Sequence, residues 1–137
     1  MITAIDTNIL LDILLPNPEH YANSLRELEV ASGGGALVIC DVVYAELCCQ
    51  FPTQSACDEF LDDFGIRIQS LSREAQFLAS RMWLEYRRRG GKRDRLLADF
   101  LVAGHARLHA DRLLTRDRGL YRSAAKDLKI VDPSRPT

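Results

Sequence analysis

Ile2-Thr3-Ala4-Ile5-Asp6-Thr7-Asn8 opens the chain, and the apolar segment ILLDILL, residues 9–15, follows it up to Pro16. Residues 2–5 predict a short buried strand that ends at Asp6. The apolar residues between 9 and 14 have the spacing of one helix face, and the proline ends that helix. A strand followed directly by a helix is the first unit of an α/β fold, with a carboxylate at the junction.

The rest of the sequence repeats this alternation. Further strands are predicted at 36–40, 65–68, 112–115 and 128–131, and helices at 19–31, 41–49, 54–64, 72–90, 96–109 and 119–124. Gly33-Gly34-Gly35 is expected to be a flexible break, and Asp41 an N-cap. We therefore predict an α/β fold in which residues 1–137 form a single domain, a three-layer α/β/α sandwich with a mainly parallel central sheet.

Length and composition indicate an ordinary globular chain. The 137 residues suit one domain, and 47% hydrophobic with 27% charged residues excludes a disordered or fibrous class. No apolar run approaches the roughly 20 residues of a membrane helix. No Lys or Arg precedes Arg26, so the basic start of a secretory signal is missing, and we expect a cytoplasmic protein without a membrane partner.

The formal net charge of -1 conceals two halves of opposite sign. Residues 1–63 hold eleven acids and one base, whereas residues 64–137 hold seventeen bases and eight acids. A basic half is consistent with a polyanionic partner, although the charges could equally be mixed over the folded surface. The densest basic segment is 87–95, directly before the predicted helix 96–109. Lys92, Arg93 and Arg95 within it are candidates for RNA phosphate contacts, and a solvated helix end is the alternative.

Four acids stand where an apolar residue or a strand end is expected. Asp6 and Asp117 each follow a predicted strand, whereas Glu46 and Asp99 have apolar neighbours at helical spacing. Each has an ordinary alternative: Asp6 and Asp117 as N-caps, Asp99 in a first helical turn, and Glu46 paired with a buried Arg. Ligands of parallel sheets bind beyond the carboxyl ends of the strands, so the four acids could share one cleft.

Clustered carboxylates without His or Cys suit a hard cation such as Mg²⁺ or Mn²⁺. Such ions activate water and stabilise charge on a phosphate, so phosphodiester hydrolysis is the reaction class that also accounts for the basic half. A zinc site is not expected. The four cysteines lack C-x-x-C spacing and are expected to be small buried residues, and Ala106 follows His105 where an HExxH motif needs Glu.

Four blocks resemble the PIN-domain ribonucleases, and within them the VapC toxins of toxin-antitoxin pairs. They are Ile5-Asp6-Thr7-Asn8, Glu46, the segment DFLVAGHA from Asp99 to Ala106, and LLTRD from Leu113 to Asp117. The resemblance covers nearly the whole chain in order. It implies a PIN-like fold and an Mg²⁺- or Mn²⁺-dependent endoribonuclease whose catalytic metal site is Asp6, Glu46, Asp99 and Asp117, with Asn8 and Thr115 supporting it by hydrogen bonds.

The resemblance also implies partners: an RNA substrate, a second copy of the chain in a homodimer, and a cognate antitoxin protein. A phosphatase of haloacid-dehalogenase type is one alternative, but that family needs a second Asp where this chain has Asn8. A PIN-like module that binds RNA or protein without cleavage is another. It would not need to keep four mutually repelling carboxylates.

Overall fold

The computed structural model describes residues 1–92, 97–124 and 127–135. Its strands are β1 (Ile2–Ile5), β2 (Ala36–Ile39), β3 (Ile66–Ile68), β4 (Arg112–Leu114) and β5 (Ile130–Val131). Its helices are α1 (Thr7–Leu14), α2 (Tyr21–Gly34), α3 (Asp41–Cys48), α4 (Gln54–Asp63), α5 (Arg73–Arg88), α6 (Leu97–His109) and α7 (Arg118–Ala124). The predicted alternation of strands and helices is confirmed.

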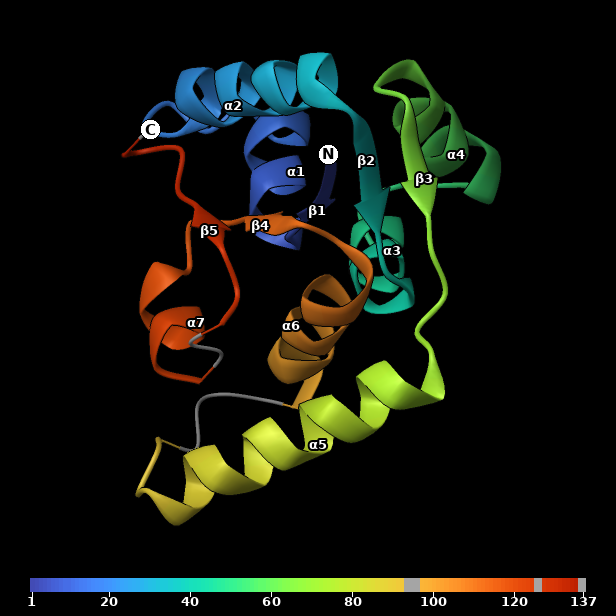
Figure 1. The fold of residues 1–137 in the computed structure, drawn as a ribbon. Helices are drawn as coiled ribbons and strands as arrows, with labels where there is room; N and C mark the ends of the chain where they lie inside the picture. The colour runs from blue at the N-terminus through green and yellow to red at the C-terminus, as the bar shows by residue number, and fades with distance from the viewer. Residues whose placement is uncertain (93–96, 125–126, 136–137) are drawn as a thin grey trace.

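The five strands form one sheet in the order β3-β2-β1-β4-β5, and every pairing is parallel. Figure 1 shows α1 and α2 on one side of the sheet and α5 and α6 on the other. The α/β class and the layered arrangement are therefore confirmed, and the sheet is entirely parallel within the described residues. Helices on both faces explain why successive residues of β1, β2 and β4 are buried.

The chain reverses its direction of travel across the sheet between β1 and β4. From β1 it proceeds to β2 and β3, and then returns through α5 and α6 to β4 on the other side of β1. The carboxyl ends of these two central strands flank the topological switch point, which is where open parallel sheets bind ligands. Asp6 directly follows β1, and Thr115 directly follows β4.

Helix α6 packs closely on α5 because position 104 carries no side chain. A Cβ atom at Gly104 would lie 2.6 Å from the Ala75 carbonyl oxygen. This close approach buries one side of α6, including Phe100 and Ala103, and fixes the helix whose first turn holds Asp99.

Two local predictions were wrong. Gly33 and Gly34 belong to α2, and the turn is made at Gly35, whose φ of 150° favours glycine. Asp41 is not the N-cap of α3, because the extended Cys40 occupies that position. The Asp41 Oδ2 atom instead accepts a hydrogen bond of 3.0 Å from the distant Leu71 N–H.

Candidate active site

Asp6 is buried at the end of β1 and accepts hydrogen bonds on both carboxylate oxygens. Its Oδ1 caps α1 by accepting from Thr7 N–H at 2.8 Å. Its Oδ2 accepts from the hydroxyls of Thr115 at 2.7 Å and Tyr121 at 3.1 Å. The N-cap alternative is thus correct, and it is compatible with a second role because the same carboxylate lies at the switch point.

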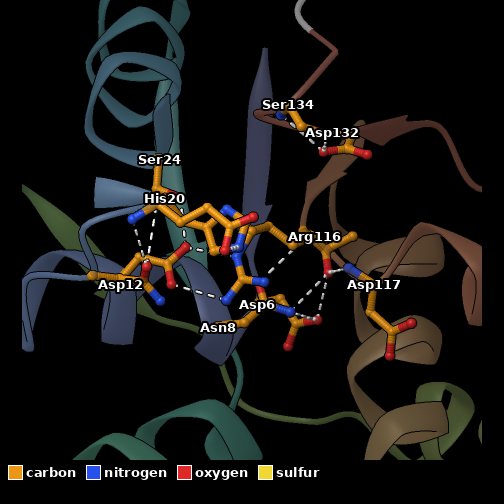
Figure 2. Close-up of polar contacts among 12 residues, drawn as sticks. Asp6, Asn8, Asp12, His20, Ser24, Arg116, Asp117, Asp132 and Ser134 are labelled. Carbon is orange, nitrogen blue, oxygen red and sulfur yellow. Dashed lines mark hydrogen bonds and ion pairs between the residues drawn. The ribbon is translucent and has the colours of Figure 1, made fainter. Parts of the chain in front are cut away.

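Asn8 and Thr115 hold this junction together, as Figure 2 shows for Asn8. The Asn8 Nδ2 lies 3.3 Å from Thr115 Oγ1 and 3.4 Å from Asp6 Oδ2. The Thr115 Oγ1 also accepts from Asp117 N–H at 3.0 Å, while Asn8 Oδ1 accepts from Arg116 N–H at 3.2 Å. The start of α1 is therefore tied to the loop that carries Asp117.

Glu46 reaches the same region from α3. The Thr7 hydroxyl donates a 2.7 Å hydrogen bond to Glu46 Oε1. The expectation that Glu46 lies on the apolar side of its helix was wrong, because Val43 and Leu47 are the buried residues of α3 and Glu46 is exposed. The exposed carboxylate is therefore available to solvent and ligands.

Asp99 and Asp117 are both half-buried. Asp99 occupies the first turn of α6, as one alternative predicted, and Asp117 immediately precedes α7. Both charges act on the fully buried Tyr121 hydroxyl, whose pKa is raised by burial, then by the charge and hydrogen bond of Asp6, and then by Asp99 and Asp117. Three of the four acids therefore lie within electrostatic reach of one hydroxyl.

The fourth acid, Glu46, interacts with the other three through Asp6. Burial raises the pKa of the Asp6 carboxyl above its usual value, hydrogen bonds from Thr115, Thr7 and Tyr121 oppose the shift, and the charge of Glu46 adds to it. Asp6 thus interacts with Glu46 on one side and with Tyr121 on the other. Electrostatic interactions thus link Glu46 to Asp6, and link Asp6, Asp99 and Asp117 to the Tyr121 hydroxyl.

The donors suit Mg²⁺ or Mn²⁺ in chemistry. Within residues 1–92, 97–124 and 127–135, no three acidic, His or Cys side chains form a ready-made metal cluster. All four candidates are nevertheless carboxylates, the ligand type that hard cations prefer. A cation would also offset the repulsion from Glu46, which adds to the larger effect of burial in raising the pKa of Asp6. We therefore regard the residues as fitting such an ion.

Sequence reasoning missed Tyr121 and an ion pair beside the site. The guanidinium of Arg116 contacts the buried Asp12 with two bonds, Nε to Oδ2 at 2.7 Å and Nη2 to Oδ1 at 2.9 Å. The Ser24 hydroxyl donates to the same Asp12 Oδ2 at 2.7 Å, as Figure 2 shows. An acid inside the apolar run 9–15 was the available signal for Asp12, since a buried charge needs a partner.

The remaining candidates are placed as follows. Lys92 is exposed after the end of α5, whereas Arg93 and Arg95 lie outside the described residues.

Cys40 and Cys57 are buried, Cys48 is half-buried and Cys49 is exposed, so the expectation of buried cysteines holds for two of the four. His105 is buried, and burial lowers its pKa to about 4, so the imidazole is neutral at pH 7.

No helix within the described ranges combines the length and apolarity needed to cross a membrane.

A comparison with curated protein sequences gives no match. Solved structures are similar in fold. VapBC2 from Rickettsia felis, crystallised with a promoter DNA fragment, matches at a TM-score of 0.74 and 22% identity, covering 96% of this chain and 98% of that one. VapBC-1 from nontypeable Haemophilus influenzae matches at 0.76 and 19%, covering 98% and 100%.

A third similar structure is VapC20 from Mycobacterium tuberculosis, described as a toxin that cleaves the sarcin-ricin loop. It matches at a TM-score of 0.62 and 13% identity, covering 88% of this chain and 94% of that one. At these identities the likeness is one of fold. Family membership rests on the sequence, because residues 3–126 match the PIN domain. The chain belongs to the PIN domain family.

Proposed function

We propose that this protein is an Mg²⁺- or Mn²⁺-dependent endoribonuclease and the toxin of a VapBC-type toxin-antitoxin pair. The observation that carries the proposal is the position of Asp6 at the switch point, coupled to Glu46 and, through Tyr121, to Asp99 and Asp117. PIN-family membership and the fold likeness to VapC toxins support it. The family match leaves the phosphatase alternative without support.

Asp6, Glu46, Asp99 and Asp117 would hold the metal. A bound Mg²⁺ or Mn²⁺ supplies a Lewis acid for the phosphodiester and makes water a better nucleophile at neutral pH. The chain's own residues preorganise the site: Thr115 and Tyr121 fix one oxygen of Asp6, and the Thr7 hydroxyl orients Glu46. Such fixed ligands lower the reorganisation that binding would otherwise require.

Lys92, Arg93 and Arg95 are proposed to contact the RNA backbone. They precede α6 in the sequence, and the first turn of α6 holds Asp99. Replacing all three with Gln should weaken binding of every RNA and flatten the dependence of log K on log salt by up to about 0.7 per lost contact. An unchanged salt slope would instead indicate a solvated helix end.

The proposed partners are an RNA substrate, a second copy of the chain and an antitoxin, within a single-domain cytoplasmic protein of residues 1–137. Two solved structures of similar fold support this proposal: VapBC2 bound to a promoter DNA fragment, and a toxin-antitoxin complex from Klebsiella pneumoniae. An antitoxin guanidinium could bind the acids in two places at once.

The cellular test is expression of the chain with and without the neighbouring gene. Expression alone should arrest growth, co-expression should yield a co-purifying complex, and Asp99→Asn should relieve the arrest while the complex persists. Harmless expression of soluble wild-type protein that cleaves RNA in vitro would remove the toxin assignment and leave the nuclease.

A further inference from the structure

Two thiols face each other between the helices that follow β2. Cys48 ends α3, Cys57 lies in α4, and their sulfur atoms are 3.8 Å apart. Both are free thiols, Cys48 half-buried and Cys57 fully buried. The other two cysteines differ: Cys40 is buried at the end of β2, and the exposed Cys49 directs its sulfur to the Ala45 carbonyl at 3.6 Å.

A second contact fixes the relative position of these helices. The Tyr44 hydroxyl, one turn before Cys48, donates a 2.7 Å hydrogen bond to Asp58 Oδ1, next to Cys57. The Tyr44–Asp58 hydrogen bond and the Cys48–Cys57 contact together hold α3 against α4. A disulfide needs a sulfur separation of about 2.05 Å. The sulfurs must therefore approach by about 1.8 Å from their 3.8 Å separation, which requires their side chains and the two helices to move together.

We propose that Cys48 and Cys57 are a reversible disulfide site that cross-links α3 to α4 and thereby acts on the position of Glu46. The oxidant is a low-molecular-weight disulfide such as oxidised glutathione. Neither Cys40 nor Cys49 takes part.

The chemistry follows from the unequal exposure of the two sulfurs. The half-buried Cys48 is the one that solvent-borne glutathione disulfide can reach. Its thiolate displaces one glutathione thiolate and forms a mixed disulfide. Cys57 then loses its proton and displaces the second glutathione, so two protein thiols are oxidised and one glutathione disulfide is reduced to two thiols. Burial, followed by the contact with Cys48, raises the pKa of Cys57 to about 11, consistent with its acting second.

The cross-link would be transmitted to Glu46 by helix geometry. Residues 46 and 48 are two positions apart, which is roughly 200° around a helix, so their side chains point to opposite sides. Drawing Cys48 towards α4 therefore draws Glu46 away from α1. The contact at risk is the 2.7 Å hydrogen bond from the Thr7 hydroxyl to Glu46 Oε1.

The first experiment maps the cross-link in the full-length chain. Reduced protein is incubated with oxidised glutathione, blocked with an alkylating agent, digested and examined by mass spectrometry. We expect a peptide pair joined through Cys48 and Cys57 that dithiothreitol separates, in both wild type and the matched control Cys49→Ser. The variant Cys48→Ser should lack it, and because Cys48 is half-buried this replacement spares the fully buried sulfur.

Three outcomes would overturn the proposal: no cross-link under conditions that oxidise free cysteine, glutathione retained on Cys48, or a cross-link that uses Cys40 or Cys49. A circular dichroism spectrum like that of the wild type shows that Cys48→Ser is folded. Were it unfolded, Cys48→Ala would replace it.

The second experiment measures Mn²⁺ affinity before and after oxidation by titration calorimetry, and this readout rests on the proposed metal site. Oxidation should weaken Mn²⁺ binding severalfold in wild type, leave Cys48→Ser unchanged, and be reversed by dithiothreitol. Equal affinity in both redox states would contradict the link to Glu46. Absence of Mn²⁺ binding by the reduced protein as well would count against the proposed function, whereas the cross-link map would be unaffected.

Discussion

Arg116→Met should destabilise the protein strongly, because it leaves the Asp12 carboxylate buried without its cation. Asp12 is 2% exposed and the Arg116 side chain 28% exposed. Removing one partner of a fully buried pair costs roughly 3 to 5 kcal/mol. Solvent partly screens the guanidinium, and the Ser24 hydrogen bond to Asp12 remains in the variant. We therefore expect the free energy of unfolding to fall by about 2 to 4 kcal/mol.

Urea unfolding followed by circular dichroism measures this difference, with thermal melts as a second readout. At this chain length we expect Tm to fall by about 3 to 5 °C per kcal/mol. Arg107→Met is the matched control, since Arg107 pairs with the exposed Asp127 and its loss should change stability only slightly. The double variant Asp12→Asn/Arg116→Met removes the charge but keeps an acceptor for Ser24, so it should recover most of the loss. A single variant as stable as wild type, or a double variant no better than the single, would refute the reasoning.

Three further predictions concern packing and the acidic site. Gly104→Ala should lower the free energy of unfolding by about 1 to 3 kcal/mol, because its Cβ would meet the Ala75 carbonyl oxygen. Gly33→Ala, which has open space in α2, should raise it by about 0.5 to 1 kcal/mol. Urea midpoints in the opposite order would contradict this. Because the pKa of Asp6 is raised in the folded protein, the stability that its protonated carboxyl contributes is complete below the usual carboxyl pKa and is lost as pH rises through the folded value. Without metal, the Tm of Asp6→Asn minus the Tm of wild type should therefore increase from about pH 4 upwards. A difference in Tm that does not change with pH would argue against this reasoning. Tyr121→Phe should lower the free energy of unfolding by about 1 to 2 kcal/mol at neutral pH, because it removes a hydrogen bond to the Asp6 carboxylate. The difference should be smaller in acid, where Asp6 is protonated. Urea unfolding at a neutral and an acidic pH tests this prediction.

The sequence was sufficient for the features that depend on local pattern. The apolar run before Asp6, the apolar run before Thr115 and the helical spacing around Asp99 identified β1, β4 and α6. A parallel sheet brings the ends of its central strands together, which is why the sequence predicts that Asp6 and Asp117 share one region.

Features that depend on distant contacts could not be predicted in this way. The Tyr121 hydroxyl bonds to Asp6, 115 positions away, and locally Tyr121 is indistinguishable from any core aromatic residue. Asp41 has the residue type of an N-cap, but its carboxylate bonds to Leu71, which the return of the chain at β3 brings near. Within the Gly33–Gly35 run, nothing local identifies which glycine has positive φ, because the end of α2 depends on how the chain enters β2.

Cleavage of RNA by purified protein, with Mg²⁺, with Mn²⁺ and with EDTA, tests the central claim most directly. Wild type should cut internally with either metal and not with EDTA. Asp6→Asn and Asp99→Asn should lose cleavage while remaining folded, and Asp63→Asn, which changes an exposed acid at the end of α4, should retain it. Full metal-dependent cleavage by Asp6→Asn, or cleavage by wild type that EDTA does not affect, would contradict a catalytic metal site built on Asp6.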